Sequence, residues 1–467
     1  MCSGINIILL FSIQIVLLLF FELGQQLDVY YAANSIHTFS IALLSGIISS
    51  TVTPLLVRVV GDDLYKLKLL FSSLLWLTVI FLSLTTFIQL VFSNKIANYL
   101  FPVLVDDSNI DIGFLISIFA IASFFNVLTF LFTSLNFCFG HYLNPIISQA
   151  VGITFQIILI YLSADKITIE LVSCYFLISQ LIIFILTSHR YIIYVVFRIK
   201  LSRNIKLLFN DVKYLSVGAA ASKSDILIDR ILLSSVGAGV LSAFNYGQLI
   251  INTALGVVSK AVSITSLVEL SGFNDRGIEQ RYIVEKLEFY ILIIIISMAF
   301  YVVFGYALLN NTIKFLEPYK VVIEISLLLV GVCIGGTLSA ITTNAYYAFK
   351  RTKQLVFLSL SVNSLFLVTK VLLFYEFGFF VIPILLSLKS LVNFYLGLVF
   401  LEKYIGGAKL VSRGLLLFLF MALSITFLLS KFIPNTYTYI GSVIAWSAII
   451  FYYRGRMFGN YYDKQNS

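Results

Sequence analysis

Residues 168–188 read TIELVSCYFLISQLIIFILTS, and residues 189–213, which follow directly, read HRYIIYVVFRIKLSRNIKLLFNDVK. The first stretch is mostly apolar and long enough to cross a bilayer as one helix, which takes about 20 residues. The second carries six Lys and Arg residues among apolar ones, a pattern typical of a helix that lies on a membrane surface. Apolar spans separated by short polar segments recur along the whole chain and decide its fold.

The composition excludes an ordinary soluble domain. Of the 467 residues, 60% are apolar and only 11% are charged, whereas soluble domains have about 25% charged residues. The mean hydropathy is +1.01. Continuous apolar runs favour helices over the alternating strands of a membrane barrel. We predict an all-α polytopic membrane protein with about 14 transmembrane helices, near residues 4–21, 30–57, 69–93, 112–138, 144–164, 168–188, 214–235, 240–267, 287–309, 321–348, 355–375, 378–401, 411–430 and 435–453.

The basic residues predict the orientation of these spans. Loops after even-numbered spans, together with the C-terminal tail, hold 21 of the 31 Lys and Arg residues, and loops after odd-numbered spans hold five. By the positive-inside rule the even loops and both termini are cytoplasmic. We expect a multi-pass protein of the bacterial inner membrane. The net charge of +9 then reflects topology, and we expect no nucleic-acid partner.

Cysteines and the first span point to no further class. The four cysteines are scattered along the chain, which indicates neither disulfides nor a metal site. The first span has no basic segment before it and no small-residue cleavage site, so we interpret it as a retained helix and not as a signal peptide. We expect no catalytic residues and no metal.

A weak internal repeat suggests two lobes. The second span opens with Tyr30-Tyr31-Ala32, and the eighth opens with Asn245-Tyr246-Gly247, about 215 residues later. Repeats of six helices enter the membrane from the same side and enclose a cavity between them. We predict a six-helix lobe over 1–188, a basic cytoplasmic linker over 189–213, a second six-helix lobe over 214–401, and helices 13 and 14 with a tail over 402–467.

Three stretches of sequence carry a family resemblance. In order and spacing they resemble the MurJ/MviN lipid II flippases of the multidrug/oligosaccharidyl-lipid/polysaccharide (MOP) exporter superfamily. The stretches are LDVYYAA at 27–33 followed by TPLL at 53–56, AFNYG at 243–247 followed by LGV at 255–257 and LVELS at 267–271, and AYYAFKRTK at 345–353. The resemblance implies 14 helices, two lobes around a central cavity, and movement of an undecaprenyl-diphosphate-linked saccharide from the inner to the outer leaflet by alternating access.

The chain departs from that family at positions expected to bind the diphosphate. Where the family carries arginines midway along helix 2, this chain has Ile41 and Ala42. Where the family has an Asp-Arg pair after the Tyr of helix 8, this chain has Gln248 and Leu249. These departures leave lipid II and a surface-polysaccharide precursor, such as that of an O-antigen or exopolysaccharide, both open as substrates.

Charged residues within the predicted spans are the candidates for function. Helix 7 carries Lys223, Asp225, Asp229 and Arg230 within eight residues. Because a helix has about 3.6 residues per turn, the two aspartates share one face and the two cations lie nearly opposite. A charge at the bilayer centre costs about 2.5–3.5 kcal/mol on insertion scales, so each needs a cavity or a partner.

Cations placed where water is scarce attract a diphosphate. We therefore predict a substrate-binding set in the second lobe and its flanking helices, consisting of Lys223, Arg230, Lys260, Lys370 and Lys389. Asp225 and Asp229 are candidates for a gate or for ion coupling. The alternative is structural, with Asp225 or Asp229 paired to Lys260 or Lys370 to hold helices together.

Two first-lobe residues are further candidates for a gate or ion coupling. Asp28 matches the family's acidic residue at the start of helix 2, which implies an outer gate or a coupling cation. Alternatively it is an exposed carboxylate at the membrane boundary. His37 lies one to two turns further along and could titrate with the proton gradient, or it could be a hydrogen-bonded structural group.

The sequence thus predicts a flippase for a polyprenyl-diphosphate-linked saccharide. We expect a monomer that contacts membrane lipids, needs no cofactor, and draws on the membrane potential, H⁺ or Na⁺. A cation-coupled multidrug exporter of the same superfamily is the alternative, although a drug site favours buried acidic residues. A membrane polysaccharide polymerase or ligase is less favoured, because the outer loops are short and nearly free of Arg and His.

Overall fold

The computed structural model describes residues 2–48, 52–60, 64–196, 220, 223–253, 319–348 and 351–404. These residues form helices joined by turns, and no strand occurs among them. The predicted spans at 287–309, 411–430 and 435–453 lie outside the described residues, as do Lys260 and most of the predicted linker.

Seven helices in the described ranges are long and apolar enough to cross a membrane. They are α4 (Leu64–Val91), α7 (Ile112–Cys138), α8 (Leu143–Leu162), α9 (Ile169–Ser188), the combined run of α13 (Lys320–Leu328) and α14 (Val330–Ala348), α15 (Thr352–Phe377) and α16 (Val381–Tyr404). The polytopic all-α class predicted from the sequence is confirmed at this level, and the total of fourteen helices stays a prediction.

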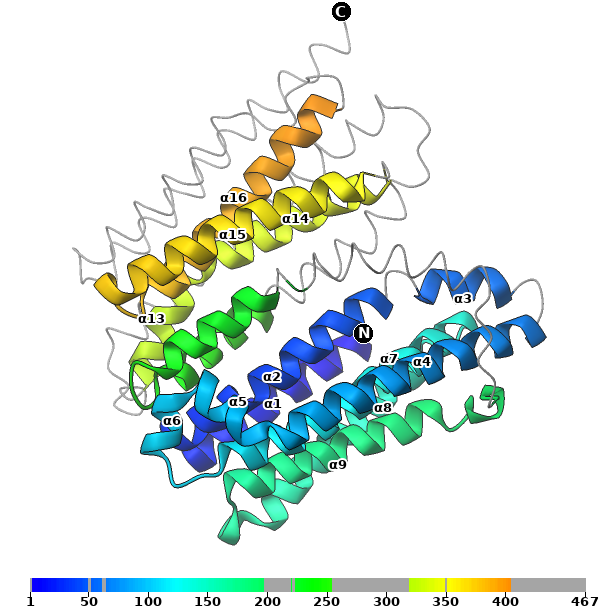
Figure 1. Cartoon of the computed structure of the whole chain (residues 1–467), viewed down its shortest axis with the longest axis horizontal. Helices are drawn as coiled ribbons and strands as arrows, with labels where there is room; N and C mark the ends of the chain where they lie inside the picture. Colours follow the sequence, from blue (N-terminus) through cyan, green and yellow to red (C-terminus); the bar gives the residue numbers. More distant parts are fainter. Residues whose placement is uncertain are drawn as a thin grey trace, which may run out of the picture. The chain divides into compact units, whose positions relative to one another are not determined.

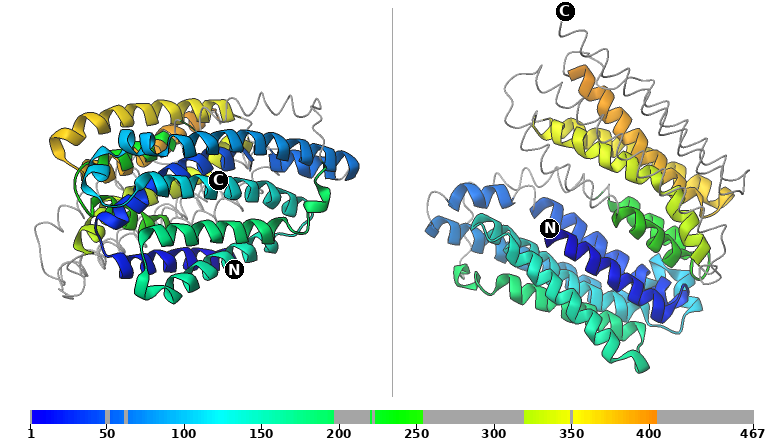
Figure 2. Two further views of the ribbon diagram at one scale, coloured as in Figure 1. Left: turned by 60° about the horizontal axis from the view of Figure 1, so that its bottom comes forward. Right: turned by 180° about the vertical axis from the view of Figure 1, so that it is seen from behind.

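The N-terminal helices form a bundle around α7 (Figure 1). α7 packs against α9, α4 and α2 (Gln25–Ile47), while α8 packs against α9 and α1 (Cys2–Phe21). Figure 2 shows the helices of this bundle, coloured from blue to teal, side by side in two further views. No charged residue occurs in α7, and a helix that is apolar on all sides is suited to a central, buried position.

The connection between α4 and α7 contains two short helices, α5 (Ser93–Leu100) and α6 (Pro102–Asp107). α5 packs on α7 and buries Ala97. The Asn94 side chain occupies the space that a Cβ at Gly113 would need.

Residues 189–196 begin the predicted linker and lie against α4. The Ser72 Oγ atom accepts a hydrogen bond from the Val196 amide at 2.8 Å and donates one to the Tyr194 carbonyl at 3.2 Å. The Trp76 indole donates to the Val196 carbonyl at 3.1 Å. This start of the linker includes a short 3₁₀ turn, η3 (Ile192–Tyr194), and the amphipathic helix predicted beyond it lies outside the described residues.

The chain divides into two compact units, which we describe separately. The first comprises residues 1–249 and 359–382, and the second comprises 250–358 and 383–467. The first unit includes the described helix 223–234, residues 240–249 of the helix 240–253, and part of α15. The lobe boundaries stated above stay a prediction.

Candidate functional site

A buried ion triad joins helix 223–234 to α15 within the first unit. The Lys370 ammonium donates to Asp225 Oδ1 at 2.7 Å and also to Asp229 Oδ1. All three side chains are essentially inaccessible. Since both carboxylates reach one ammonium, they share a face of their helix as predicted. The structure therefore contains the helix-tying pair that the sequence left open, and substrate binding by Lys370 stays a prediction.

Arg230 follows Asp229 and is 8% exposed. Its Nε and Nη1 atoms have no hydrogen-bond partner among the described residues. Asp229 and the Tyr31 hydroxyl are its nearest electrostatic neighbours. A buried guanidinium is usually paired with an acceptor, so the lack of one for these two nitrogens in the described part of the chain is unusual.

Asp28 is completely buried, and it joins α2 to helix 240–253. Its Oδ2 atom accepts from the Gly239 amide at 2.5 Å, and its Oδ1 atom accepts from the Ser242 amide at 2.6 Å. Backbone N–H groups at a helix N-terminus have no partner within the helix, and an anion there is stabilised by the helix dipole. The alternative of an exposed carboxylate at the membrane boundary was wrong, because the N-terminus of another helix covers Asp28.

A tyrosine pair extends this contact between α1, α2 and helix 240–253. The Tyr31 hydroxyl donates to Gln14 Oε1 at 2.5 Å, and the Tyr246 hydroxyl donates to the Gln14 carbonyl at 2.9 Å. The two rings meet edge to face, with centroids 5.8 Å apart. Gln14 therefore links the contact to the interior of the N-terminal bundle, since it also lines the cavity described next.

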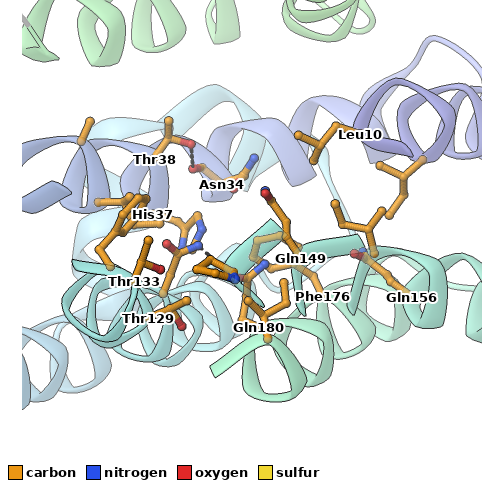
Figure 3. Close-up of a pocket in the computed structure, with 18 of the residues that line it drawn as sticks. Leu10, Asn34, His37, Thr38, Thr129, Thr133, Gln149, Gln156, Phe176 and Gln180 are labelled. Atoms are coloured by element: carbon orange, nitrogen blue, oxygen red, sulfur yellow. Dashed lines mark hydrogen bonds between the residues drawn. The ribbon is translucent and has the colours of Figure 1, made fainter. Parts of the chain in front are cut away.

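A cavity of about 590 Å³ lies inside the N-terminal bundle. Helices α1, α2, α7, α8 and α9 all contribute to its wall, which contains no Asp, Glu, Lys or Arg. Figure 3 shows side chains of α2 facing those of the helices opposite across this space. The wall includes six side-chain amides, three threonines, a tyrosine and a histidine: Gln14, Asn34, Asn126, Gln149, Gln156, Gln180, Thr38, Thr129, Thr133, Tyr30 and His37.

His37 lies at the wall of this cavity and is 5% exposed. Its Nδ1 atom is 3.1 Å from the Phe119 carbonyl and 2.7 Å from Ser123 Oγ. A carbonyl oxygen can only accept, so the contact is a hydrogen bond when Nδ1 carries the proton. Phe119 and Phe176 pack against the ring. This bonding is the structural role that the sequence allowed, and coupling to protons stays a prediction.

The structure brings together only part of the predicted site. It joins Asp225, Asp229 and Lys370, and places Arg230 beside them. Lys223 and Lys389 are partly exposed, and Lys260 lies outside the described residues.

The cavity inside the N-terminal bundle was not predicted from the sequence. The signal that could have found it is the group of amide side chains within otherwise apolar spans, such as Gln149, Gln156 and Gln180. Ile41 and Ala42, where the chain departs from the family it resembles, also line this cavity.

Seven helices of membrane-spanning length among the described residues define a multi-pass membrane protein. The lipid II flippase MurJ, in an inward closed conformation, superposes with a TM-score of 0.74 at 16% identity, over 98% of each chain. An inward-facing MATE family multidrug resistance transporter of the MOP superfamily gives 0.65 at 14% identity, over 88% of this chain and 95% of the other.

A MOP superfamily transporter from Pyrococcus furiosus, described as having reverse polarity of its binding pocket, gives a TM-score of 0.62 at 13% identity, over 86% of this chain and 94% of the other. No family model matches the sequence, and no curated protein matches it. The chain thus has the MurJ-like fold of the MOP superfamily, and the resemblance noted in the sequence is confirmed for the fold.

Proposed function

We propose that the chain is a flippase that moves a polyprenyl-diphosphate-linked saccharide from the inner to the outer leaflet of a bacterial inner membrane by alternating access. The observation that carries this proposal is Arg230. Its guanidinium is buried, with Nε and Nη1 unpartnered among the described residues. A planar guanidinium is well matched to phosphate oxygens, and charge-assisted hydrogen bonds to phosphate are among the stronger polar contacts.

A diphosphate would complete the hydrogen bonding of Arg230, whose charge the triad already offsets. A buried charge is costly unless an anion compensates it. The triad nearby already holds two carboxylates and one ammonium, so its own charge is balanced to within one negative unit. Arg230 adds a positive charge beside it, and an incoming diphosphate supplies acceptors for its unpartnered nitrogens.

Asp28 fits the role of an outer gate in this proposal. Alternating access requires contacts between helices that can break and form again. The two hydrogen bonds from Asp28 to Gly239 and Ser242 connect helices that are distant in sequence. In this proposal both termini lie in the cytoplasm and the protein is a monomer. Transport is coupled to the membrane potential, H⁺ or Na⁺.

The test is a flipping assay with the full-length protein in vesicles. The probe is undecaprenyl diphosphate carrying a fluorescently labelled N-acetylglucosamine, and a membrane-impermeant quencher reports the leaflet in which it resides. We expect Arg230→Gln to slow exchange about tenfold or more, since it removes charge-assisted hydrogen bonds, and Arg230→Lys to retain part of the rate. Lys166→Gln is the matched control, because Lys166 is an exposed cation. Wild-type vesicles that exchange the probe no faster than empty vesicles would refute the proposal.

A multidrug exporter is the second candidate, because MATE family transporters share the fold. A lipophilic cation prefers a site with a carboxylate, and the cavity wall of the N-terminal bundle has none. Accumulation of a fluorescent cationic dye in cells with and without the protein separates the two. Dye efflux that depends on the protein, without exchange of the lipid probe, would favour the exporter.

A further inference from the structure

The cavity in the N-terminal bundle combines a charge-free wall with an unusual number of amides for a membrane domain. Amide groups both donate and accept hydrogen bonds, and so do hydroxyl groups. Six amides come from all five helices around the cavity. Burying them in an apolar setting is unfavourable unless they find partners. Their convergence on one space therefore indicates a hydroxyl-rich ligand.

The hydrogen bonds within the wall leave part of this capacity unused. Asn126 donates to Gln180 Oε1 at 2.8 Å, and Asn6 donates to Gln149 Oε1 at 2.8 Å. Each glutamine acceptor is engaged in these pairs, so its NH₂ group can still donate to another partner. Gln14 has the same arrangement, since its Oε1 accepts from Tyr31.

Gln156 is the independent sign of a ligand. The side chain is 2% exposed, it lines the cavity, and its Nε2 atom has no hydrogen-bond partner among the described residues. An unsatisfied buried amide costs roughly as much as a lost hydrogen bond. Such a group is tolerated where a bound molecule completes its hydrogen bonding.

The chemistry of the wall excludes other occupants. An acyl chain has no acceptor for the amide N–H groups, so burying these groups against it would be unfavourable. An organic cation or a phosphate needs an opposite charge, which the wall lacks. The volume lies in the range of about 300–1,000 Å³ that holds drug-sized ligands, and aromatic rings from Tyr30 and Phe176 offer flat apolar faces.

We propose that this cavity is a binding site for the uncharged sugar portion of the substrate, separate from the phosphate contact at Arg230. The inference rests on the proposed function and names the part of the substrate that the first bundle holds. Gln156 and Gln180 are its binding residues, donating to sugar hydroxyls. The phosphate and the saccharide are then bound by different elements. The phosphate needs a cation, whereas the neutral saccharide needs uncharged polar groups.

The test compares two probes on the purified full-length protein in nanodiscs. One is undecaprenyl diphosphate, and the other is the same lipid carrying an uncharged disaccharide of N-acetylhexosamines. We expect wild-type protein to bind the glycosylated lipid about tenfold more tightly than the bare lipid. Gln156→Leu and Gln180→Leu should each weaken binding of the glycosylated lipid about fivefold and leave binding of the bare lipid unchanged.

Control variants separate this inference from folding and from the proposed function. Gln156→Leu removes an unpartnered amide and should not lower the melting temperature. Gln89→Leu removes an amide of α4 that bonds Ser40 outside the cavity wall, and it should change neither affinity. Equal wild-type affinity for the two probes, or equal losses for both in the cavity variants, would overturn the sugar site. Binding of neither probe would instead refute the proposed function.

Discussion

Replacing Lys370 with methionine should destabilise the protein strongly, because it removes the buried ammonium that both Asp225 and Asp229 contact. Asp225 and Asp229 lie one turn apart and share the Lys370 ammonium, with all three side chains excluded from solvent. Removing one partner of a buried ion pair costs about 3–5 kcal/mol, since an uncompensated charge stays in a low-dielectric setting. Methionine keeps most of the side-chain volume, so packing contributes little to the loss.

Further variants at this triad separate the effect of its charges from the effect of packing. Asp225→Asn leaves one carboxylate facing one ammonium, and we expect a loss of about 1–2 kcal/mol from the weakened hydrogen bond. The triple variant Lys370→Met, Asp225→Asn, Asp229→Asn removes all three charges of the triad and leaves only Arg230 charged beside it, so it should regain most of the stability that Lys370→Met loses. Reversible unfolding in mixed micelles gives the free energy of unfolding for each variant.

The same series decides between a structural and a substrate-binding Lys370. If Lys370→Met unfolds at the wild-type denaturant concentration but binds undecaprenyl diphosphate more than tenfold more weakly, the ammonium faces the substrate and the triad argument is wrong. A destabilised variant that the two asparagine substitutions fail to rescue would also contradict it, since then the loss would not come from the charges of Asp225 and Asp229.

Two further predictions concern contacts between helices. Asp28→Ala should free the amides at the start of helix 240–253 and cost about 1–3 kcal/mol, so that hydrogen exchange at Ser242 becomes faster while exchange in α9 is unchanged. Gly335→Ala should lower the melting temperature, because a Cβ there would lie 2.5 Å from the Ser390 backbone carbon, and overpacking costs about 1–3 kcal/mol. Gly397→Ala is its control, since its nearest neighbour would be 3.7 Å away, and a similar loss in both variants would contradict the close-contact explanation.

The sequence predicted the membrane helices well because hydrophobic length is a local property. The predicted span 112–138 coincides with α7, and 168–188 differs from α9 (Ile169–Ser188) by one residue. The predicted span 321–348 contains three glycines, Gly331, Gly335 and Gly336. Ser387 and Ser390 of α16 lie close to Gly331 and Gly335, which agrees with close helix packing.

Partner choice was less predictable, since it depends on which helices become neighbours. The sequence placed Asp225 and Asp229 on one face and offered two lysines as partners, but only the fold brings Lys370 to them. Asp28 shows the same limit, because its partners are backbone amides more than 200 residues away and no side-chain pattern marks a backbone amide. The amides of the cavity were visible in the sequence, yet nothing local shows that they converge.

The division of polar groups within the first unit matches the chemistry of a diphosphate-linked saccharide. Such a lipid has one strongly anionic segment and one neutral segment rich in hydroxyl groups. The buried charges of Arg230 and of the ion triad lie on helix 223–234 and α15. The cavity wall of the N-terminal bundle, in contrast, presents amides and hydroxyls without any charge. A cation in the cavity would lose its hydration when a neutral sugar binds, and the sugar would supply no opposite charge to compensate that cost. An amide in place of Arg230 would bind phosphate less strongly. Each kind of polar group therefore lies where it can contact the matching part of the lipid. Swapping the two groups, with Gln156→Arg and Arg230→Gln in one chain, should abolish movement of the glycosylated probe between leaflets in a folded protein.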